Sequence, residues 1–175
     1  MRKKLFYVLF TICMVTMLTA CDNPTPEPEP TPELIELTVD LALNYGESYG
    51  DSTTNFFFGA MDNDLATTNS GRNYYFDFVS DGIVDIPVAG TYTVTTDKAA
   101  GTMVAAYVNE YVGVYQGCYS ELFEDGKPVD GSEEGYTDGY MTITHNGDNT
   151  ITLNIFMTGY TQMRAIIPNS QWEIY

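Results

Sequence analysis

The sequence is poor in the residues that most often carry out chemistry or bind polyanions. Its 175 residues include one histidine, three cysteines and seven Lys and Arg, against 24 Asp and Glu. The formal net charge of −17 argues against nucleic acid as a partner, because phosphate binding requires cationic side chains. It also disfavours contact with an anionic membrane surface, and it suits solubility or basic partners.

Catalytic motifs are also missing. The sequence has no HExxH or CxxC pattern and no glycine-rich phosphate loop. His145 precedes Asn146-Gly147, which places it beside a predicted turn rather than in a catalytic pair. We therefore predict no enzyme and no cofactor. A glycosidase is kept as a second alternative, since paired carboxylates cannot be located from sequence.

Acidic clusters raise the question of a metal site. Asp62-Asn63-Asp64 forms one cluster, and the second comprises Asp130, Glu133, Glu134 and Asp138. Calcium takes six to eight oxygen ligands, which such loops supply in part. Neither cluster has the helix-loop-helix calcium spacing, so no metal site is predicted.

The first 20 residues are typical of an export signal. Cationic MRKK is followed by the apolar run LFYVLFTICMVTMLTA. A basic start, a short apolar core and small residues before the break define a secretory signal. The run is short for a permanent span, which takes roughly 20 apolar residues.

The end of this run, Leu18-Thr19-Ala20-Cys21, resembles the lipobox of bacterial lipoproteins. The resemblance implies cleavage before Cys21, attachment of a diacylglycerol to its thiol and anchoring in a membrane. Removing the signal takes away Arg2, Lys3 and Lys4, which leaves four cations against 24 acids and a charge near −20. Cys13 would also leave, so Cys118 would be the one free thiol, predicted to be buried and inert.

Residues 21–33 form the predicted linker, in which proline occupies every second position from Pro24 to Pro32. This alternation prevents helix and ladder formation and favours an extended polyproline-II-like chain of about 3.1 Å per residue. We interpret the segment as a spacer between membrane and domain.

Residues 34–175 form the predicted domain, and its patterns favour strands. LIELTVDLALNY alternates from Ile35 to Tyr45, with Leu37, Leu41 and Leu43 on the apolar face. MTITHNGDNTITLNIFM is the clearest hairpin, and the final WEIY is a candidate edge strand. Several short strands separated by turn residues predict an all-β fold, a single antiparallel β-sandwich or barrel.

Aromatic residues supply the candidate ligand-binding site. The stretch GTMVAAYVNEYVGVYQGCY spaces its tyrosines by four, which fits a helical stripe, but its Gly and Val content favours strand, broken near Asn109-Glu110. An exposed aromatic face of a sheet can stack on sugar rings; the alternative is that these rings fill the core. The candidates are Tyr107, Tyr111, Tyr115, Tyr119 and Trp172.

The lipobox, the spacer and the Tyr/Phe-rich strands together resemble small surface lipoproteins of Bacteroidota. This resemblance is carried by two segments, YYFDFVSDG…DIPVAGTYTV and YTDGYMTITHNGDNTITLNI. It implies a cell-envelope protein, lipid-anchored at the outer membrane and exposed at the surface. An Asp after the lipidated cysteine is associated with inner-membrane retention in proteobacteria, which leaves the leaflet open. The implied role is binding, with glycan capture as the leading function and a structural or adhesive protein as the alternative.

Overall fold

The computed structural model describes residues 34–159 and 162–175. The predicted signal segment, the lipid acceptor Cys21 and the spacer lie outside the described residues, so they stay predictions. Within the described ranges, no helix has the length and apolar character needed to cross a membrane.

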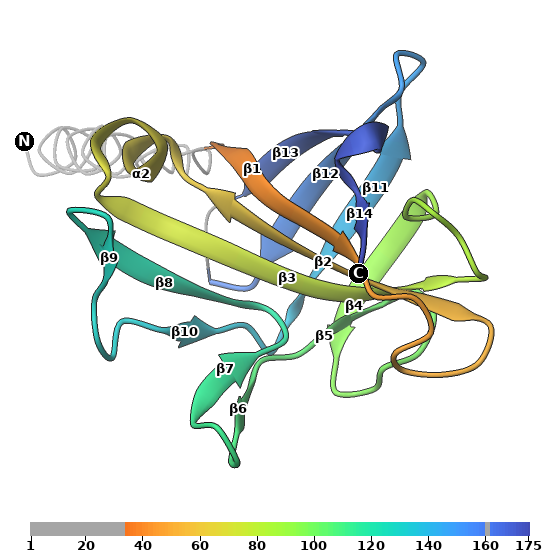
Figure 1. Ribbon diagram of the computed structural model, residues 1–175, viewed down its shortest axis with the longest axis horizontal. Coiled ribbons are helices and arrows are strands. Elements are labelled where there is room, and N and C mark those ends of the chain that lie inside the picture. The colour runs from red at the N-terminus through yellow and green to blue at the C-terminus, as the bar shows by residue number, and fades with distance from the viewer. Residues whose placement is uncertain (1–33, 160–161) are drawn as a thin grey trace, which may run out of the picture. The chain divides into compact units, whose positions relative to one another are not determined.

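The described chain is almost entirely β, which confirms the predicted fold class (Figure 1). Eight strands follow one another in the order β3-β2-β1-β13-β12-β11-β4-β5, and β5 pairs back to β3 to close a barrel-like sheet. Their bounds are β1 Ile35–Asn44, β2 Thr53–Met61, β3 Gly71–Asp81, β4 Gly90–Thr95, β5 Thr102–Val104, β11 Gly139–His145, β12 Thr150–Met157 and β13 Met163–Pro168.

Smaller elements extend this sheet. β8 (Tyr119–Glu124) pairs with the first half of β3 and is flanked by β9 (Lys127–Pro128) and β10 (Glu134–Gly135). β6 (Tyr107–Asn109) and β7 (Val114–Gln116) form a separate hairpin that projects away from the barrel in Figure 1. The remaining elements are α2 (Asn63–Thr68), η1 (Asn169–Gln171) and β14 (Glu173–Ile174).

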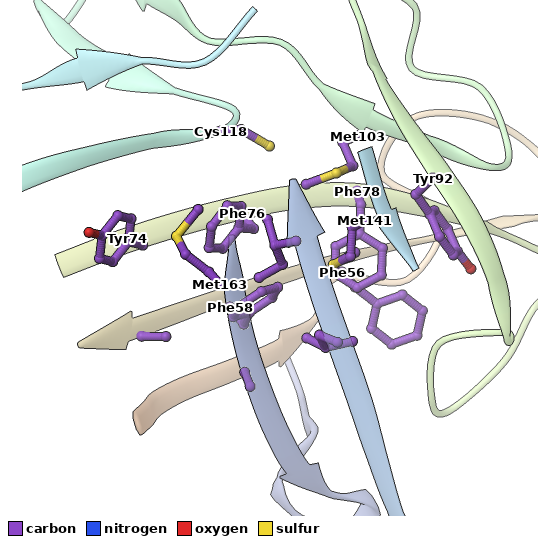
Figure 2. Close-up of a cluster of buried hydrophobic side chains, with 14 of the residues drawn as sticks. Phe56, Phe58, Tyr74, Phe76, Phe78, Tyr92, Met103, Cys118, Met141 and Met163 are labelled. Carbon is purple, nitrogen blue, oxygen red and sulfur yellow. The ribbon is translucent and has the colours of Figure 1, made fainter. Parts of the chain in front are cut away.

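Side chains fill the inside of the barrel. Rings from β2 and β3 meet methionine and branched side chains from β5, β11, β12 and β13 (Figure 2). Phe56 and Phe78 stack at 5.6 Å between ring centroids, and Phe58 and Phe76 lie 4.8 Å apart. An eight-stranded barrel either fills its interior with side chains or holds one small ligand, and here buried side chains fill it, so we look for a site on the outer surface.

Several predicted elements are confirmed. The hairpin of β11 and β12 pairs Gly139 with Met157 through to His145 with Ile151, as its alternation indicated. The tyrosine-bearing stretch is extended and its first strand ends at Asn109. The last residues form the edge strand β14, which pairs with β1 in parallel.

The strict alternation predicted for β1 is wrong in its second half. The register with β2 shifts between Val39 and Leu41, which marks a β-bulge. Beyond it the faces exchange, so Ala42 and Asn44 are buried while Leu41 is 38% exposed. The Asn44 amide then donates to the carbonyls of Val84 and Asp85 and ties the loop that follows β3 to β1.

Two predicted loops contain more structure than the sequence indicated. Asp62 caps α2 by accepting from Leu65 N and also accepts from Arg72 N, which explains this acidic cluster without a metal. In the acidic loop after β8, Tyr136 is 2% exposed and its hydroxyl donates to Ser120 Oγ at 2.7 Å. The loop is therefore fastened to the sheet.

Gly117 joins β7 to β8 where no side chain fits. Its φ is +82°, and an added Cβ would lie 2.6 Å from the carbonyl oxygen of Ala105. Gly113 has a similar φ of +69° but open space around it. We expect Gly117→Ala to lower the free energy of unfolding by at least about 2 kcal/mol, through strain and clash, and Gly113→Ala by about 1 kcal/mol. Urea unfolding measures both, and equal losses would contradict this packing.

Candidate functional site

A row of aromatic rings crosses the outer face of the sheet. Neighbouring ring centroids in this row are 4.6 to 6.5 Å apart. This range suits favourable aromatic pairs. In order, the rings are Tyr175, Tyr45, Phe57, Tyr75, Tyr119 and Tyr115.

Strand register places these rings together. Tyr75 on β3 lies directly opposite Tyr119 on β8, and their rings stack at 4.6 Å with an interplanar angle of 24°. Opposed residues on one face of an antiparallel pair are the closest side-chain neighbours in a sheet. Phe57 on β2 stacks on the other side of Tyr75 at 6.1 Å. The outer face of β2, β3 and β8 is therefore aromatic where a solvated sheet face would be polar.

The pocket lies where β3 changes partners. Residues Gly71–Tyr75 pair with β8, whereas Phe78 and Val79 pair with β5, so Asp77 sits at a fork between the two strands. The hollow at this fork has a volume of about 250 Å³. We call it the fork pocket, and its lining residues are Tyr45, Tyr49, Asn55, Phe57, Asp77, Tyr115, Gln116, Gly117 and Tyr119.

Asp77 is the one carboxylate among these lining residues, and it is only 7% exposed. Its Oδ2 accepts from the Tyr49 hydroxyl at 2.7 Å and its Oδ1 from the Asn55 amide at 2.6 Å. Burial raises the pKa of Asp77, while the hydrogen bonds from Tyr49 and Asn55 and the charge of Lys98 oppose the rise. The backbone carbonyl of Asp77, free of strand pairing at the fork, accepts from Cys118 Sγ at 3.5 Å.

Tyr49 covers the carboxylate from the loop between β1 and β2. Burial, followed by the nearby Asp77 charge, raises the pKa of its phenol well above the usual value, which keeps the hydroxyl a donor. Lys98 Nζ lies 4.3 Å from the centre of the Tyr49 ring and 5.1 Å from that of Tyr107. Tyr49 thus contacts the buried carboxylate through its hydroxyl and an ammonium group through its ring.

The five predicted ligand-binding aromatics occupy four different environments. Tyr115 and Tyr119 line the fork pocket. Tyr107 does not line it but donates its hydroxyl to Gln116 Oε1 at 2.6 Å, and Tyr111 is 99% exposed in the turn between β6 and β7. Trp172 packs edge-on against Phe56 at 5.1 Å and is 7% exposed, so it contributes to the core and not to a surface platform.

The sequence indicated that the four tyrosines share one sheet face. In the structure they do not. Gly113 and Gly117, both at positive φ, turn the chain twice within this stretch. Those turns direct Tyr115 and Tyr119 to the pocket and leave Tyr111 at the tip of the hairpin.

Sequence reasoning missed the other half of the site. Tyr45 and Tyr49 come from the loop between β1 and β2, Asn55 and Phe57 from β2, and Asp77 from β3. One signal was present: NFFF in β2 and YYF in β3 place aromatic rings on both faces of neighbouring strands. Such a pattern indicates that the outer face of the sheet is covered by another part of the chain or binds a ligand.

Two larger hollows, of about 610 Å³ each, carry less ligand chemistry. One lies along residues 83–89 beside His145, whose Nε2 is bonded to the Pro87 carbonyl at 2.7 Å. The other lies between residues 34–38 and 62–64, where Asp62 already serves as a helix cap. Across residues 34–159 and 162–175, no group of three or more His, Cys, Asp or Glu side chains could hold a metal ion.

The two aspartates Asp77 and Asp148 should protonate in a defined order. The pKa of Asp77 is raised by burial, whereas that of Asp148 is lowered by its hydrogen bond from Thr150. On acidification we expect Asp77 to protonate first. A folded-state pKa above the unfolded one means that ionisation of Asp77 opposes folding, so its contribution to stability falls as the pH rises from the ordinary aspartate value to the raised one. Carboxyl ¹³C NMR follows both groups, and the reverse order would refute the burial of Asp77.

Comparison of the chain with models of known protein families, with curated proteins and with solved structures gives no match. No family is therefore assigned to it. The interpretation of the fork pocket rests on its own residues, namely five aromatic rings arranged around one carboxylate and two amide side chains.

Proposed function

We propose that the chain is an exported, lipid-anchored binding protein of a bacterial cell envelope that captures a carbohydrate in the fork pocket. The observation that carries the proposal is the pocket itself, with aromatic walls around Asp77, Asn55 and Gln116. Sugar rings stack their C–H faces on aromatic rings, and their hydroxyls bind carboxylates and amides. Small-molecule sites generally combine apolar walls with a few placed polar groups in this way.

Export and anchoring are supported by the sequence. A basic start, a short apolar run and the sequence LTAC fit a lipoprotein signal, and the alternating prolines fit a spacer. Two or more acyl chains hold a protein stably, since each buried methylene contributes about 0.8 kcal/mol. We place the protein at the outer membrane, exposed at the surface, where a glycan ligand is accessible.

Binding fits the pocket better than hydrolysis does. Glycoside hydrolysis generally uses two carboxyl groups on either side of the scissile bond. The lining residues of the fork pocket supply one carboxylate, Asp77, and both of its oxygens already accept hydrogen bonds.

One observation favours a second function, adhesion through protein contacts. The β6–β7 hairpin carries exposed apolar side chains at its tip and along its strands, a pattern typical of interaction surfaces. These side chains are Val108, Tyr111, Val112 and Val114, which are 49 to 99% exposed.

A glycan array separates the two functions. The probe is a form of the chain that begins at Pro32, which retains all of the residues that make up the barrel core. We expect Tyr115→Ala to lower glycan binding at least tenfold, or about 1.4 kcal/mol, because it removes a wall of the pocket. Tyr111→Ala, at the exposed turn, is the matched control and should change binding less than twofold.

Circular dichroism verifies that both variants are folded. Absence of binding to every glycan, or equal losses in the two variants, would overturn carbohydrate capture in the fork pocket. A loss confined to Tyr111→Ala would instead favour the hairpin as the contact surface.

The lipid anchor has a separate test. In bacterial envelope fractions, we expect the mature protein to begin at residue 21 and to carry an acyl-glyceryl mass on that residue. Cys21→Ala should lack the added mass and leave the membrane fraction. Intact-mass spectrometry of the two forms tests this expectation. Masses that differ by the substitution alone would contradict lipid attachment at Cys21.

A further inference from the structure

We propose that the fork pocket selects a ligand that carries a positively charged nitrogen, such as a protonated amino sugar. The inference rests on the proposed carbohydrate function and names the chemical group that the pocket recognises. The experiment below tests it separately from that function. Three features carry it: unused capacity on the buried Asp77 carboxylate, aromatic rings around that carboxylate, and the distribution of charge over the domain.

The carboxylate retains room for a donor. Its two oxygens offer about four lone-pair sites, and the hydrogen bonds from Tyr49 and Asn55 use two of them. Both of these donors are neutral, so the hydrogen bonds leave the carboxylate without a contacting counter-charge. A buried charge is costly unless it is paired. An ammonium group in the pocket would supply that pairing.

The walls favour the same group. The faces of tyrosine and phenylalanine rings are electron-rich and attract cations within about 6 Å of the ring centre, most strongly where water is displaced. The chain already uses this attraction, because Lys98 Nζ lies 4.3 Å from the centre of Tyr49, itself a lining residue. The pocket side of the same cluster presents Tyr45, Phe57, Tyr115 and Tyr119.

Few protein cations oppose such a ligand. Arg72 is paired with Glu134, and Arg164 with Glu36. Lys127 lies on β9, away from the lining residues. Lys98 is therefore the cation that a charged ligand would meet first. The acidic excess of the whole chain, with a net charge of −17, attracts cations and raises their rate of encounter.

Size limits the ligand to a small unit. The volume of about 250 Å³ falls below the range of about 300 to 1,000 Å³ that is usual for drug-sized ligands. A single sugar ring or a small organic ammonium ion is therefore the appropriate probe, and a long internal stretch of a polysaccharide is not.

The test is a titration near neutral pH of the form that begins at Pro32, followed by NMR chemical shifts. The probes are glucosamine, which is cationic, glucose and N-acetylglucosamine, which are neutral, and tetramethylammonium, which is cationic without a sugar. We expect glucosamine to bind at least tenfold more tightly than the two neutral sugars. Asp77→Asn should abolish this preference, and Asp148→Asn, in an exposed turn, should retain it.

A second variant covers the case in which Asp77→Asn does not fold. Lys98→Met keeps an unbranched side chain only one atom shorter and removes the competing charge near Tyr49. We expect it to tighten glucosamine binding severalfold and to leave glucose binding unchanged. Equal effects on the two sugars would count against charge recognition.

The outcomes separate the inference from the function on which it rests. Equal binding of glucose and glucosamine would overturn the inference and leave carbohydrate capture intact. Binding of tetramethylammonium without any sugar would uphold recognition of a cation and overturn carbohydrate capture. Binding of none of the four probes would overturn both.

Discussion

Strand β3 pairs with β2 from Asn73 to Asp81, and its other edge is divided between two strands. β8 takes the first half, up to Tyr75, and β5 takes Phe78 and Val79 and so closes the barrel. Between them the strand has no ladder partner on that edge, and its polar groups need other partners. The carbonyl of Asp77 accepts from Cys118 Sγ instead. The fork pocket is a consequence of how the barrel closes.

The same strands serve two apolar surfaces with different roles. On the inner face, Phe56 and Phe58 of β2 pack with Phe76 and Phe78 of β3 and leave no room for a ligand. On the outer face, the rings that alternate with them stack across strands and enclose a carboxylate. A charge held in such surroundings has a stronger interaction with a ligand than it would have in water, because the local polarity is low. The burial that makes the ionised Asp77 unfavourable for folding would therefore also strengthen its interaction with the ligand that we propose.

Features of the fold that depend on neighbouring residues could be predicted from the sequence, whereas those that depend on residues far apart in the chain could not. Local signals were reliable: the Asn146-Gly147 turn predicted the β11–β12 hairpin, and Gly113 and Gly117 correctly argued against a helix. The bulge at residue 40 could not be predicted, because apolar and polar residues continue to alternate in the sequence where the register with β2 shifts. Closure as a barrel was one of two predicted options, since β3–β5 and β1–β13 pairings are set by distant residues. The site was half predicted for the same reason. Tyr115 and Tyr119 stood out as neighbours in the chain, but Asp77 became a pocket residue only through the strand fork and the Tyr49 loop.

The parallel pairing of β1 with β13 has a consequence for the order of folding. Ile35 is opposite Met163, and the adjacent ion pair of Glu36 with Arg164 joins residues 128 positions apart. A contact of such sequence separation forms slowly, because the entropy of closing the loop is lost before the contact is gained. The barrel cannot be completed until nearly all of the chain is present. A chain with this topology keeps the edge of β1 that faces β13 unpaired until its last strands have been synthesised.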